Sequence, residues 1–258
     1  GTSTDVSLIE DNKALLRRET SVGDITVRAS SLDVRTIGAG GGSIAYVPEL
    51  TRALRVGPES AGAEPGPAAY QKGGVEPTVT DANVVLGYLP ESQKLGGDMQ
   101  ISKENAVVAV QKVADALSIS LYEAAEGIVK IVNENMFGAL RLVSVEKGYD
   151  PRKFSLMAFG GAGPLHANAL GVLTQSWPVV IPPGPGVLCA YGDATTRLRD
   201  EASRTFIARF SDLKAGTIVD HLDALDKIAR SAMLAEGETG SAVVNDADIG
   251  SQFQVDVR

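Results

Sequence analysis

The clearest pattern in the sequence is an apolar stripe of helical period between residues 120 and 147. Ser120 and Glu123 have the spacing of a capping box, and Gly148 followed by Pro151 is a typical helix end. We therefore predict a helix over 120–147, which at ~1.5 Å per residue is about 40 Å long. Its apolar face repeats every three and four residues and consists of Leu121, Ala124, Ala125, Ile128, Ile131, Val132, Met136, Ala139, Leu140 and Val143.

Three shorter helices are predicted from their start signals and periods. Ser102, with Asn105 three residues later, opens a helix that runs to about Leu117. Thr80-Asp81 is a candidate N-cap for a short helix ending near Leu86. Residues 217–235 have an amphipathic pattern.

Alternating polar and apolar positions predict strands at both ends of the chain. Val6 and Leu8 alternate with polar residues, and Glu10-Asp11-Asn12 forms a turn, which predicts a hairpin. Short strands are expected around Ala45–Val47 and Leu54–Val56. Further strand patterns lie at Thr205–Phe210, Ala242–Val244 and Phe253–Val257. Because strand patterns begin and end so close to the two ends, we expect the chain to be a central piece of a longer protein.

The middle of the chain predicts a strand, helix, strand unit. Phe154–Phe159 and Val179–Ile181 are short apolar runs typical of buried strands, and a helix with proline in its first turn begins at Pro164. The glycine turn Gly160–Gly163 joins the first strand to this helix. Such a unit is characteristic of an open α/β domain, so we expect an α/β fold.

Composition and charge exclude several functional classes. The net charge of −8 argues against a nucleic-acid surface, which needs clustered Lys and Arg. No apolar stretch is long enough for a membrane span, and no signal peptide is recognisable. The single cysteine, Cys189, fits a reducing compartment, so we expect a cytoplasmic protein. Its apolar surroundings favour an inert, buried thiol.

Clusters of glycine and hydroxyl residues mark the candidate sites. Gly1, Thr2, Ser3 and Thr4 precede Asp5, and such a turn can wrap phosphate oxygens while the carboxylate holds Mg²⁺. An ordinary polar turn explains the same residues. Likewise, Gly160–Gly163 either receives a phosphorylated ligand at a helix N-terminus or is a plain tight turn. The glycine loop 38–43 and the irregular stretch 57–67 are open to functional and structural interpretations.

The residues that bind transition metals are few. The histidines are His166, for which a capping or supporting role is favoured, and His221, which is expected at the surface. No paired His or Cys spacing exists, so a transition-metal site is not expected. Asp5, Asp81 and Asp193 lie beside glycine-rich or hydroxyl-rich loops and would suit a hard cation.

Five motifs together resemble the hydantoinase A/oxoprolinase family, which includes 5-oxoprolinases, ATP-dependent N-methylhydantoinases and subunits of acetone and acetophenone carboxylases. In order and spacing they are GTSTDVSLI (1–9), TIGAGGGSIA (36–45), RVGPESAGAEPGP (55–67), PTVTDANVVLG (77–87) and MAFGGAGPLHA (157–167). The resemblance covers about residues 1–205. The family's first phosphate motif has no counterpart in this sequence.

The resemblance implies the second half of an actin-like ATPase (ribonuclease H-like) fold over 1–200, followed by the start of a C-terminal α+β domain over 201–258. It implies that Gly1, Thr2, Ser3 and Thr4 face the phosphates of ATP and that Asp5 is a catalytic residue near Mg²⁺. By the same resemblance Gly160, Gly161, Ala162 and Gly163 line the adenosine, and helix 120–147 connects the two domains.

The resemblance also implies the chemistry. ATP would phosphorylate the carbonyl oxygen of a cyclic amide, with 5-oxoproline as the first choice of substrate and hydantoin as another. An ATP-dependent ketone carboxylase subunit is the main alternative, and a non-catalytic nucleotide-binding fragment is the alternative of another class. The implied partners are a second copy of the chain or a hydantoinase B-type subunit or domain.

Overall fold

The computed structural model describes residues 1–17, 19–22, 24–27, 31–214, 216–239, 247 and 249–253. The chain divides into two compact units, Gly1–Gly192 and Asp193–Arg258, which are described separately. The expected strand at 242–244 lies outside the described residues, as does all but the first residue of the expected strand at 253–257. The candidate site lies in the first unit.

The first unit begins with antiparallel strand pairs. β1 (Thr4–Ser7) pairs with β8 (Val34–Ile37), and Thr4 lies opposite Ile37. The predicted hairpin is confirmed, since Asp11 and Asn12 take the positive φ angles of a tight two-residue turn. The segment between β1 and β8 forms three short pairs: β2 (Ile9–Glu10) with β3 (Lys13–Ala14), β4 (Leu16–Arg17) with β7 (Ser31–Leu32), and β5 (Thr20–Val22) with β6 (Ile25–Val27).

A second antiparallel pair follows the glycine loop. β9 (Ser43–Tyr46) pairs with β10 (Arg55–Ser60), which confirms the two predicted short strands. Arg55 lies opposite Tyr46 and Ser60 opposite Ser43, with an irregularity in register between Val56 and Ser60. The chain then passes through the 3-10 turn η1 (Ala68–Tyr70) into the helical part of the unit.

Three consecutive helices follow: α1 (Val79–Val85), α2 (Lys103–Leu117) and α3 (Leu121–Val143). The predicted caps of α2 and α3 are confirmed. Ser102 accepts from the Asn105 amide, and Ser120 and Glu123 form the expected capping box. The predicted start of α1 was wrong by two residues, because Thr78 is the N-cap and Asp81 closes a capping box with it.

The long helix α3 ends earlier than predicted. It spans 23 residues and stops at Val143, and a separate 3-10 turn, η2 (Val145–Lys147), leads to Gly148. The Ser144 hydroxyl donates to the Leu140 carbonyl at 2.6 Å, and the Ser144 backbone leaves the helical conformation. A hydroxyl that bonds back to the preceding turn competes with the helical ladder, which explains the early end.

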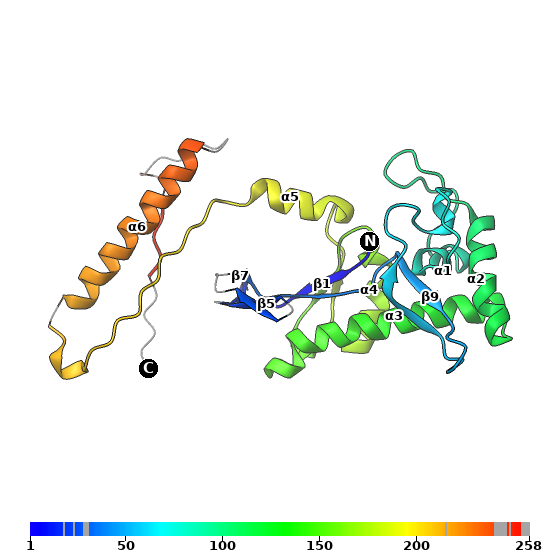
Figure 1. Ribbon diagram of the computed structural model, residues 1–258, viewed down its shortest axis with the longest axis horizontal. Helices are drawn as coiled ribbons and strands as arrows, with labels where there is room; N and C mark the ends of the chain where they lie inside the picture. The colour runs from blue at the N-terminus through cyan, green and yellow to red at the C-terminus, as the bar shows by residue number, and fades with distance from the viewer. Residues whose placement is uncertain are drawn as a thin grey trace. The chain divides into compact units, whose positions relative to one another are not determined.

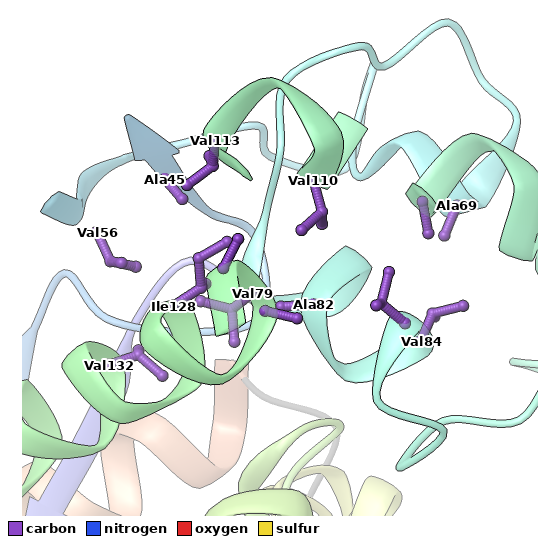
Figure 2. Close-up of a cluster of buried hydrophobic side chains, with 14 of the residues drawn as sticks. Ala45, Val56, Ala69, Val79, Ala82, Val84, Val110, Val113, Ile128 and Val132 are labelled. Atoms are coloured by element: carbon purple, nitrogen blue, oxygen red, sulfur yellow. The ribbon is translucent and has the colours of Figure 1, made fainter. Parts of the chain in front are cut away.

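The hydrophobic core lies where α1, α2 and α3 meet β9 and β10 (Figures 1 and 2). Its buried members are mostly alanine and valine, which lets the helices approach closely. Ile128 of α3 is fully buried and lies beside Val79 of α1 (Figure 2). The helix α3 also packs against β1, β8 and β10, so it supports both the helical part and the strands.

The predicted strand, helix, strand unit is confirmed. β11 (Leu156–Met157) and β12 (Val179–Val180) are parallel and are joined through α4 (Gly163–Thr174). The expectation that both strands are buried was wrong. Met157 is 53% exposed and Ile181 44% exposed, because this sheet has two strands and α4 contacts both of them from one side.

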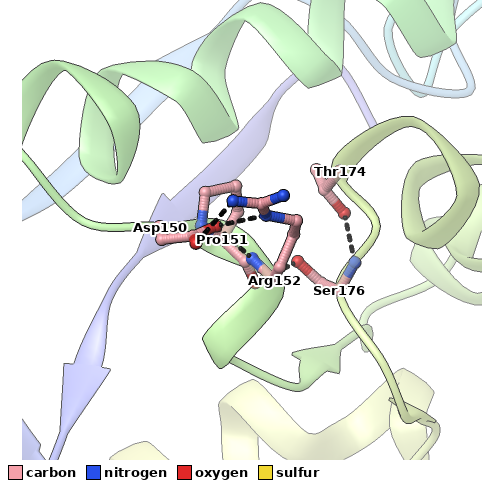
Figure 3. A network of polar contacts seen from close by, with 5 residues as sticks. All are labelled: Asp150, Pro151, Arg152, Thr174 and Ser176. Atoms are coloured by element: carbon pink, nitrogen blue, oxygen red, sulfur yellow. Dashed lines mark hydrogen bonds and ion pairs between the residues drawn. The ribbon is translucent and has the colours of Figure 1, made fainter.

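A polar network holds this unit to the preceding loop (Figure 3). The 3-10 turn η3 (Pro151–Lys153) is capped by Asp150, which also forms a two-point ion pair with Arg152. The Ser176 hydroxyl donates to the Pro151 carbonyl at 2.8 Å, and the Ser176 amide donates to Thr174. These bonds fix the C-terminal end of α4 against the segment that enters β11.

The remainder of the chain departs further from the predictions. The 3-10 turn η4 (Pro185–Val187) and α5 (Leu188–Thr195) lead to the boundary of the units. Cys189 on α5 is exposed, so the expectation of a buried thiol was wrong. The side of α5 that carries it is not covered by the core, and an apolar sequence neighbourhood does not bury a thiol by itself.

In the second unit the amphipathic helix is confirmed as α6 (Thr217–Thr239). The predicted strand at Thr205–Phe210 was wrong. Residues 201–209 have no regular structure, and Phe210 begins the 3-10 turn η5 (Phe210–Asp212). A strand needs a neighbour to pair with, and the described part of this unit contains none. His221 is half-buried against the ring of Phe206.

None of the described helices is long and apolar enough to cross a membrane.

Candidate functional site

The turn at Gly1–Asp5 is anchored to the glycine loop 38–43. The Thr4 hydroxyl donates to the Ala39 carbonyl at 2.6 Å, and the Gly42 amide donates to the Gly1 carbonyl at 2.8 Å. Residues Gly1, Thr2 and Ser3 are exposed, and no hydrogen bond of the Thr2 or Ser3 hydroxyl is recorded among the described residues. The hydroxyl of Thr4 therefore holds the loop, whereas those of Thr2 and Ser3 are available to a ligand.

Gly40 is a glycine because backbone from the turn occupies the place of its side chain. A Cβ there would lie 2.7 Å from the Gly1 carbonyl oxygen and 3.1 Å from the Ser3 nitrogen. The Ser43 hydroxyl accepts a hydrogen bond from the Gly40 amide at 3.0 Å and closes the loop on itself. The loop and the turn are thus packed backbone to backbone.

Gly41 brings a third segment to the same place. Its carbonyl accepts from both the amide and the hydroxyl of Thr80, each at 2.8 Å. A Cβ on Gly41 would lie 3.6 Å from the Ala162 Cβ and 4.0 Å from the Gly1 nitrogen. The turn Gly1–Asp5, the loop 38–43 and the turn Gly160–Gly163 therefore converge around one glycine, although they lie far apart in the sequence.

The turn Gly160–Gly163 leads directly into α4. Gly160 has φ +91°, which favours glycine, while no heavy atom lies within 4 Å of a Cβ placed on Gly160 or Gly161. The N-cap residue Ala162 offers no side-chain hydrogen bond to the first turn of α4. In the first turn of α4, Pro164 has no N–H and the Leu165 amide donates to the Ala162 carbonyl at 3.0 Å, which leaves the Gly163 amide and the helix dipole to attract an anion or a polar ligand.

The helix α4 is held behind the site by a buried histidine. His166 is 1% exposed, and its Nδ1 lies 2.8 Å from the Asn133 Oδ1 on α3. Because that oxygen only accepts, Nδ1 carries the proton of this hydrogen bond. Burial lowers the pKa of His166 to about 4. His166 therefore ties α4 to α3, which agrees with the supporting role predicted for it.

Two of the carboxylates suggested as cation ligands, Asp5 and Asp81, differ in exposure and in hydrogen bonding. Asp5 is exposed, and its Oδ1 accepts from the Thr36 hydroxyl at 2.5 Å, while no described residue donates to Oδ2. Asp81 is fully buried and accepts from the amides of Ala68, Ala69 and Thr78 and from the Thr78 hydroxyl.

Asp81 is thus a structural residue, and the suggestion that it suits a cation was wrong because its oxygens are saturated. Burial raises the pKa of Asp81, and the hydrogen bonds from Thr78, Ala69 and Ala68 oppose that shift. The described residues contain no group of three or more His, Cys, Asp or Glu side chains that would hold a metal by themselves. A single exposed carboxylate such as Asp5 matches Mg²⁺, which takes most of its ligands from phosphates and water.

Of the predicted site residues, Gly1, Ser3, Thr4 and Ala162 lie against the loop 38–43, whereas Asp5 is hydrogen-bonded to Thr36 on β8. Sequence reasoning had left that loop without a role and had not linked it to Thr80. The motifs TIGAGGGSIA and PTVTDANVVLG contained these residues, but nothing in their spacing indicated that Thr80 hydrogen-bonds to Gly41.

Known proteins are similar to this chain in sequence and in structure. The family model for Hydantoinase/oxoprolinase matches residues 1–202, so the chain belongs to the hydantoinase/oxoprolinase family. It is 41% identical over 213 residues to the caprolactamase subunit alpha of Pseudomonas jessenii, covering 82% of this chain and 30% of that protein. It is 38% identical over 269 residues to the acetophenone carboxylase gamma subunit of Aromatoleum aromaticum, covering 99% and 35%.

Two solved structures are similar as well. The crystal structure of the ATP-dependent caprolactamase from Pseudomonas jessenii matches with a TM-score of 0.73 and 38% identity, covering 93% of this chain and 35% of that one. A nucleotide-free acetone carboxylase structure matches with a TM-score of 0.77 and 26% identity, covering 92% and 35%. The chain therefore spans about a third of the length of each of these relatives.

Proposed function

We propose that this chain forms part of an ATP-binding site in an enzyme that activates a cyclic amide by phosphorylation. The observation that carries the proposal is the convergence of Gly1 and Ala162 on Gly41. It brings the turn that carries the exposed Thr2 and Ser3 hydroxyls close to a helix N-terminus without a side-chain cap, and Asp5 follows in the same turn. Membership of a family that includes a protein named an ATP-dependent caprolactamase supports it.

In this proposal each segment has its own task. The backbone of Gly1–Thr4 and the hydroxyls of Thr2 and Ser3 hold the phosphates, while the turn Gly160–Gly163 lines the adenosine. Asp5 holds Mg²⁺ directly or through water. When bound, Mg²⁺ would neutralise charge on the transferred phosphoryl group. The loop 38–43 keeps the turns in register, because it is bonded to Gly1 and Thr80 and lies against Ala162.

The proposed reaction follows from the low reactivity of amides. Resonance deactivates the ring carbonyl, and transfer of the γ-phosphoryl group to its oxygen, with release of ADP, gives an imidate-like phosphate. Water then adds to the carbon, and the ring C–N bond breaks as the nitrogen is protonated, which leaves an acyl phosphate. A second water hydrolyses the acyl phosphate to the amino acid and inorganic phosphate. The part described here would contribute by positioning the nucleotide and by neutralising charge. 5-Oxoproline is the proposed first substrate, since relatives named 5-oxoprolinase match 98% and 81% of the chain.

The finer fold assignment is also a proposal. We infer that residues 1–200 are the second half of an actin-like ATPase fold, with α3 as the connecting helix, and that 201–258 begin an α+β domain. Relatives named as subunits of caprolactamase and acetophenone carboxylase suggest that a second subunit or domain completes the enzyme.

A ketone carboxylase subunit is the second candidate. The observation that favours it is the similarity to the acetone carboxylase structure, whose TM-score of 0.77 is slightly higher than that for caprolactamase. In that case the phosphorylated oxygen belongs to an enolate, and bicarbonate is consumed with ATP. A nucleotide-binding part without catalytic activity is a third possibility, and the experiment below separates all three.

The test is a titration of the full-length protein with Mg²⁺ and ATP, followed by measurement of ATP hydrolysis with 5-oxoproline, with hydantoin, and with acetone plus bicarbonate. Asp5→Ala is expected to abolish ATP turnover with little effect on folding, because the side chain is exposed. Asp98→Ala is the matched control, an exposed aspartate outside the site. Unchanged turnover in Asp5→Ala would exclude the role given to Asp5, and an absence of nucleotide binding would refute the site.

A further inference from the structure

A groove of about 510 Å³ lies on the first unit, next to the loop that holds the proposed phosphate turn. One wall is the pair β9–β10 and another is the face of α3 that carries Ile131 and Asn135. Its apolar lining includes Ile37, Leu54 and Ile131, whereas Val56 is only 6% exposed and belongs to the hydrophobic core. The proposed function leaves this groove without a role.

Two glycines shape the bottom of the groove. A Cβ on Gly57 would lie 2.8 Å from the Gly38 carbonyl oxygen, and a Cβ on Gly38 would lie 3.2 Å from the Pro58 Cβ. Gly57 also has φ +68°, which favours glycine. Two backbone segments thus meet closely here, and the floor is fixed in shape.

The polar groups of the groove are few and lie near one another. Arg55 is the one charged side chain among the described lining residues. It lies opposite Tyr46 in the β9–β10 register, so the two side chains share a face of the pair. The Asn135 amide nitrogen donates to the Val56 carbonyl at 3.4 Å, which holds that side chain against β10.

Arg55 has no counterion within the described part of the chain. Its guanidinium forms no ion pair with any described residue. An exposed arginine on a surface is ordinary. An arginine that is the single charge of an apolar groove, beside a phenol and an amide, has the donors that a carboxylate requires.

We propose that this groove binds a small monocarboxylate, whose carboxylate pairs with Arg55 while its carbon skeleton lies against Ile37, Leu54 and Ile131. Gly38 and Ala39 line the groove, and the Ala39 carbonyl accepts from Thr4 of the phosphate turn. Occupancy of the groove is therefore connected to that turn through a single hydrogen bond. The bound acid is either the substrate or a regulator, and the two share the same chemistry.

The test compares two probes that differ by one carboxylate: 5-oxoproline, and 2-pyrrolidinone, which is the same ring without it. Calorimetric titrations of the full-length protein are expected to show tighter binding of 5-oxoproline. Arg55→Gln is expected to weaken binding of 5-oxoproline by about 10- to 100-fold, the usual value of a charged hydrogen bond, and to leave 2-pyrrolidinone unchanged. Arg55→Lys should restore part of the loss.

Arg52→Gln is the matched control, because Arg52 lies in the turn between β9 and β10 but does not line the groove. It should leave both affinities unchanged. Equal loss for both probes in Arg55→Gln, or no loss for either, would overturn the proposal. A steady-state assay then identifies the acid: a raised KM for 5-oxoproline with unchanged kcat indicates the substrate, and an unchanged KM with weaker binding indicates a regulator.

A failure of the groove proposal can be told apart from a failure of the proposed ATP-binding site. Titration of the same Arg55→Gln protein with Mg²⁺ and ATP should give wild-type affinity, since Arg55 is not among the residues proposed to hold the nucleotide. If wild-type protein binds 5-oxoproline through Arg55 but no nucleotide, the groove stands and the proposed function fails.

Discussion

Two glycine-rich segments that look alike in the sequence have different physical reasons for their glycines. In the loop 38–43, neighbouring backbone or hydroxyl atoms occupy the position of the missing side chain, 2.7 Å away at Gly40 and 2.8 Å at Gly41. In the turn Gly160–Gly163, no atom lies within 4 Å of that position at Gly160 or Gly161. The first segment is filled by the protein, and the second leaves space beside a helix N-terminus.

The comparison separates glycines that serve packing from those that leave room for a ligand. A glycine with a close backbone neighbour is required by the fold whatever the protein binds. A glycine with empty space around it and an ordinary φ, such as Gly161, is not required by the fold. We expect substitutions in the two segments to affect stability and nucleotide binding in different proportions.

The largest effect is expected for Gly40→Ala. The new methyl group would meet the Gly1 carbonyl, which is backbone and cannot rotate away, so the turn must move. We expect a loss of about 3 kcal/mol in the free energy of unfolding, the upper end of overpacking costs, and a loss of ATP binding. Urea denaturation and calorimetry measure the two effects. A variant with wild-type stability would show that the loop and the turn are not packed as described.

A smaller effect is expected from the histidine behind the open turn. Burial lowers the pKa of His166 to about 4 in the folded protein, whereas the unfolded chain has the ordinary value of 6.5. The unfolded state therefore binds the proton first, and stability falls as the pH drops from about 6.5 towards 4. Between pH 7 and pH 5 this amounts to about 2 kcal/mol.

His166→Gln isolates this contribution. The difference in urea stability between pH 7 and pH 5 should be smaller in the variant than in the wild type by about 2 kcal/mol. All other ionisable groups are the same in the two proteins, so their contributions cancel. Equal pH dependence in the two proteins would mean that His166 is not held neutral between α3 and α4.

The smallest effect on stability is expected for Gly161→Ala. No atom obstructs the new methyl group and the residue has no positive φ, so the free energy of unfolding should change by less than about 0.5 kcal/mol. The methyl would, however, occupy the space given to the adenosine. Calorimetry should show weaker ATP binding in a fully stable protein. Wild-type ATP affinity would indicate that this turn does not line the nucleotide.

The local features of the fold were predictable from the sequence. The caps Ser102 and Ser120, the hairpin turn at Asp11-Asn12 and the parallel unit around α4 are confirmed. The caps and the turn depend on residues a few positions apart, and the parallel unit depends on a strand, a turn, a helix and a strand that follow one another along the chain, so local sequence patterns determine them. The early end of α3 was missed because one hydroxyl, that of Ser144, competes with the helix.

Burial and long-range proximity were not predictable in the same way. Met157 and Cys189 are exposed although their neighbours are apolar, since burial depends on which elements cover a surface. The candidate site was predicted as separate motifs. Their meeting at the loop 38–43 involves hydrogen bonds between residues 35 or more positions apart, such as those from Thr4 to Ala39 and from Thr80 to Gly41. No periodicity or spacing encodes such a contact.

The central claim, that Gly1–Asp5, the loop 38–43 and Gly160–Gly163 form one nucleotide site, is tested most directly by a crystal structure of the full-length protein with Mg²⁺ and a non-hydrolysable ATP analogue. The account predicts phosphate oxygens within about 3 Å of the backbone or hydroxyls of Thr2 and Ser3, Mg²⁺ beside Asp5, and the adenosine against Gly160–Gly163. A nucleotide bound elsewhere, with these residues still exposed to solvent, would contradict it.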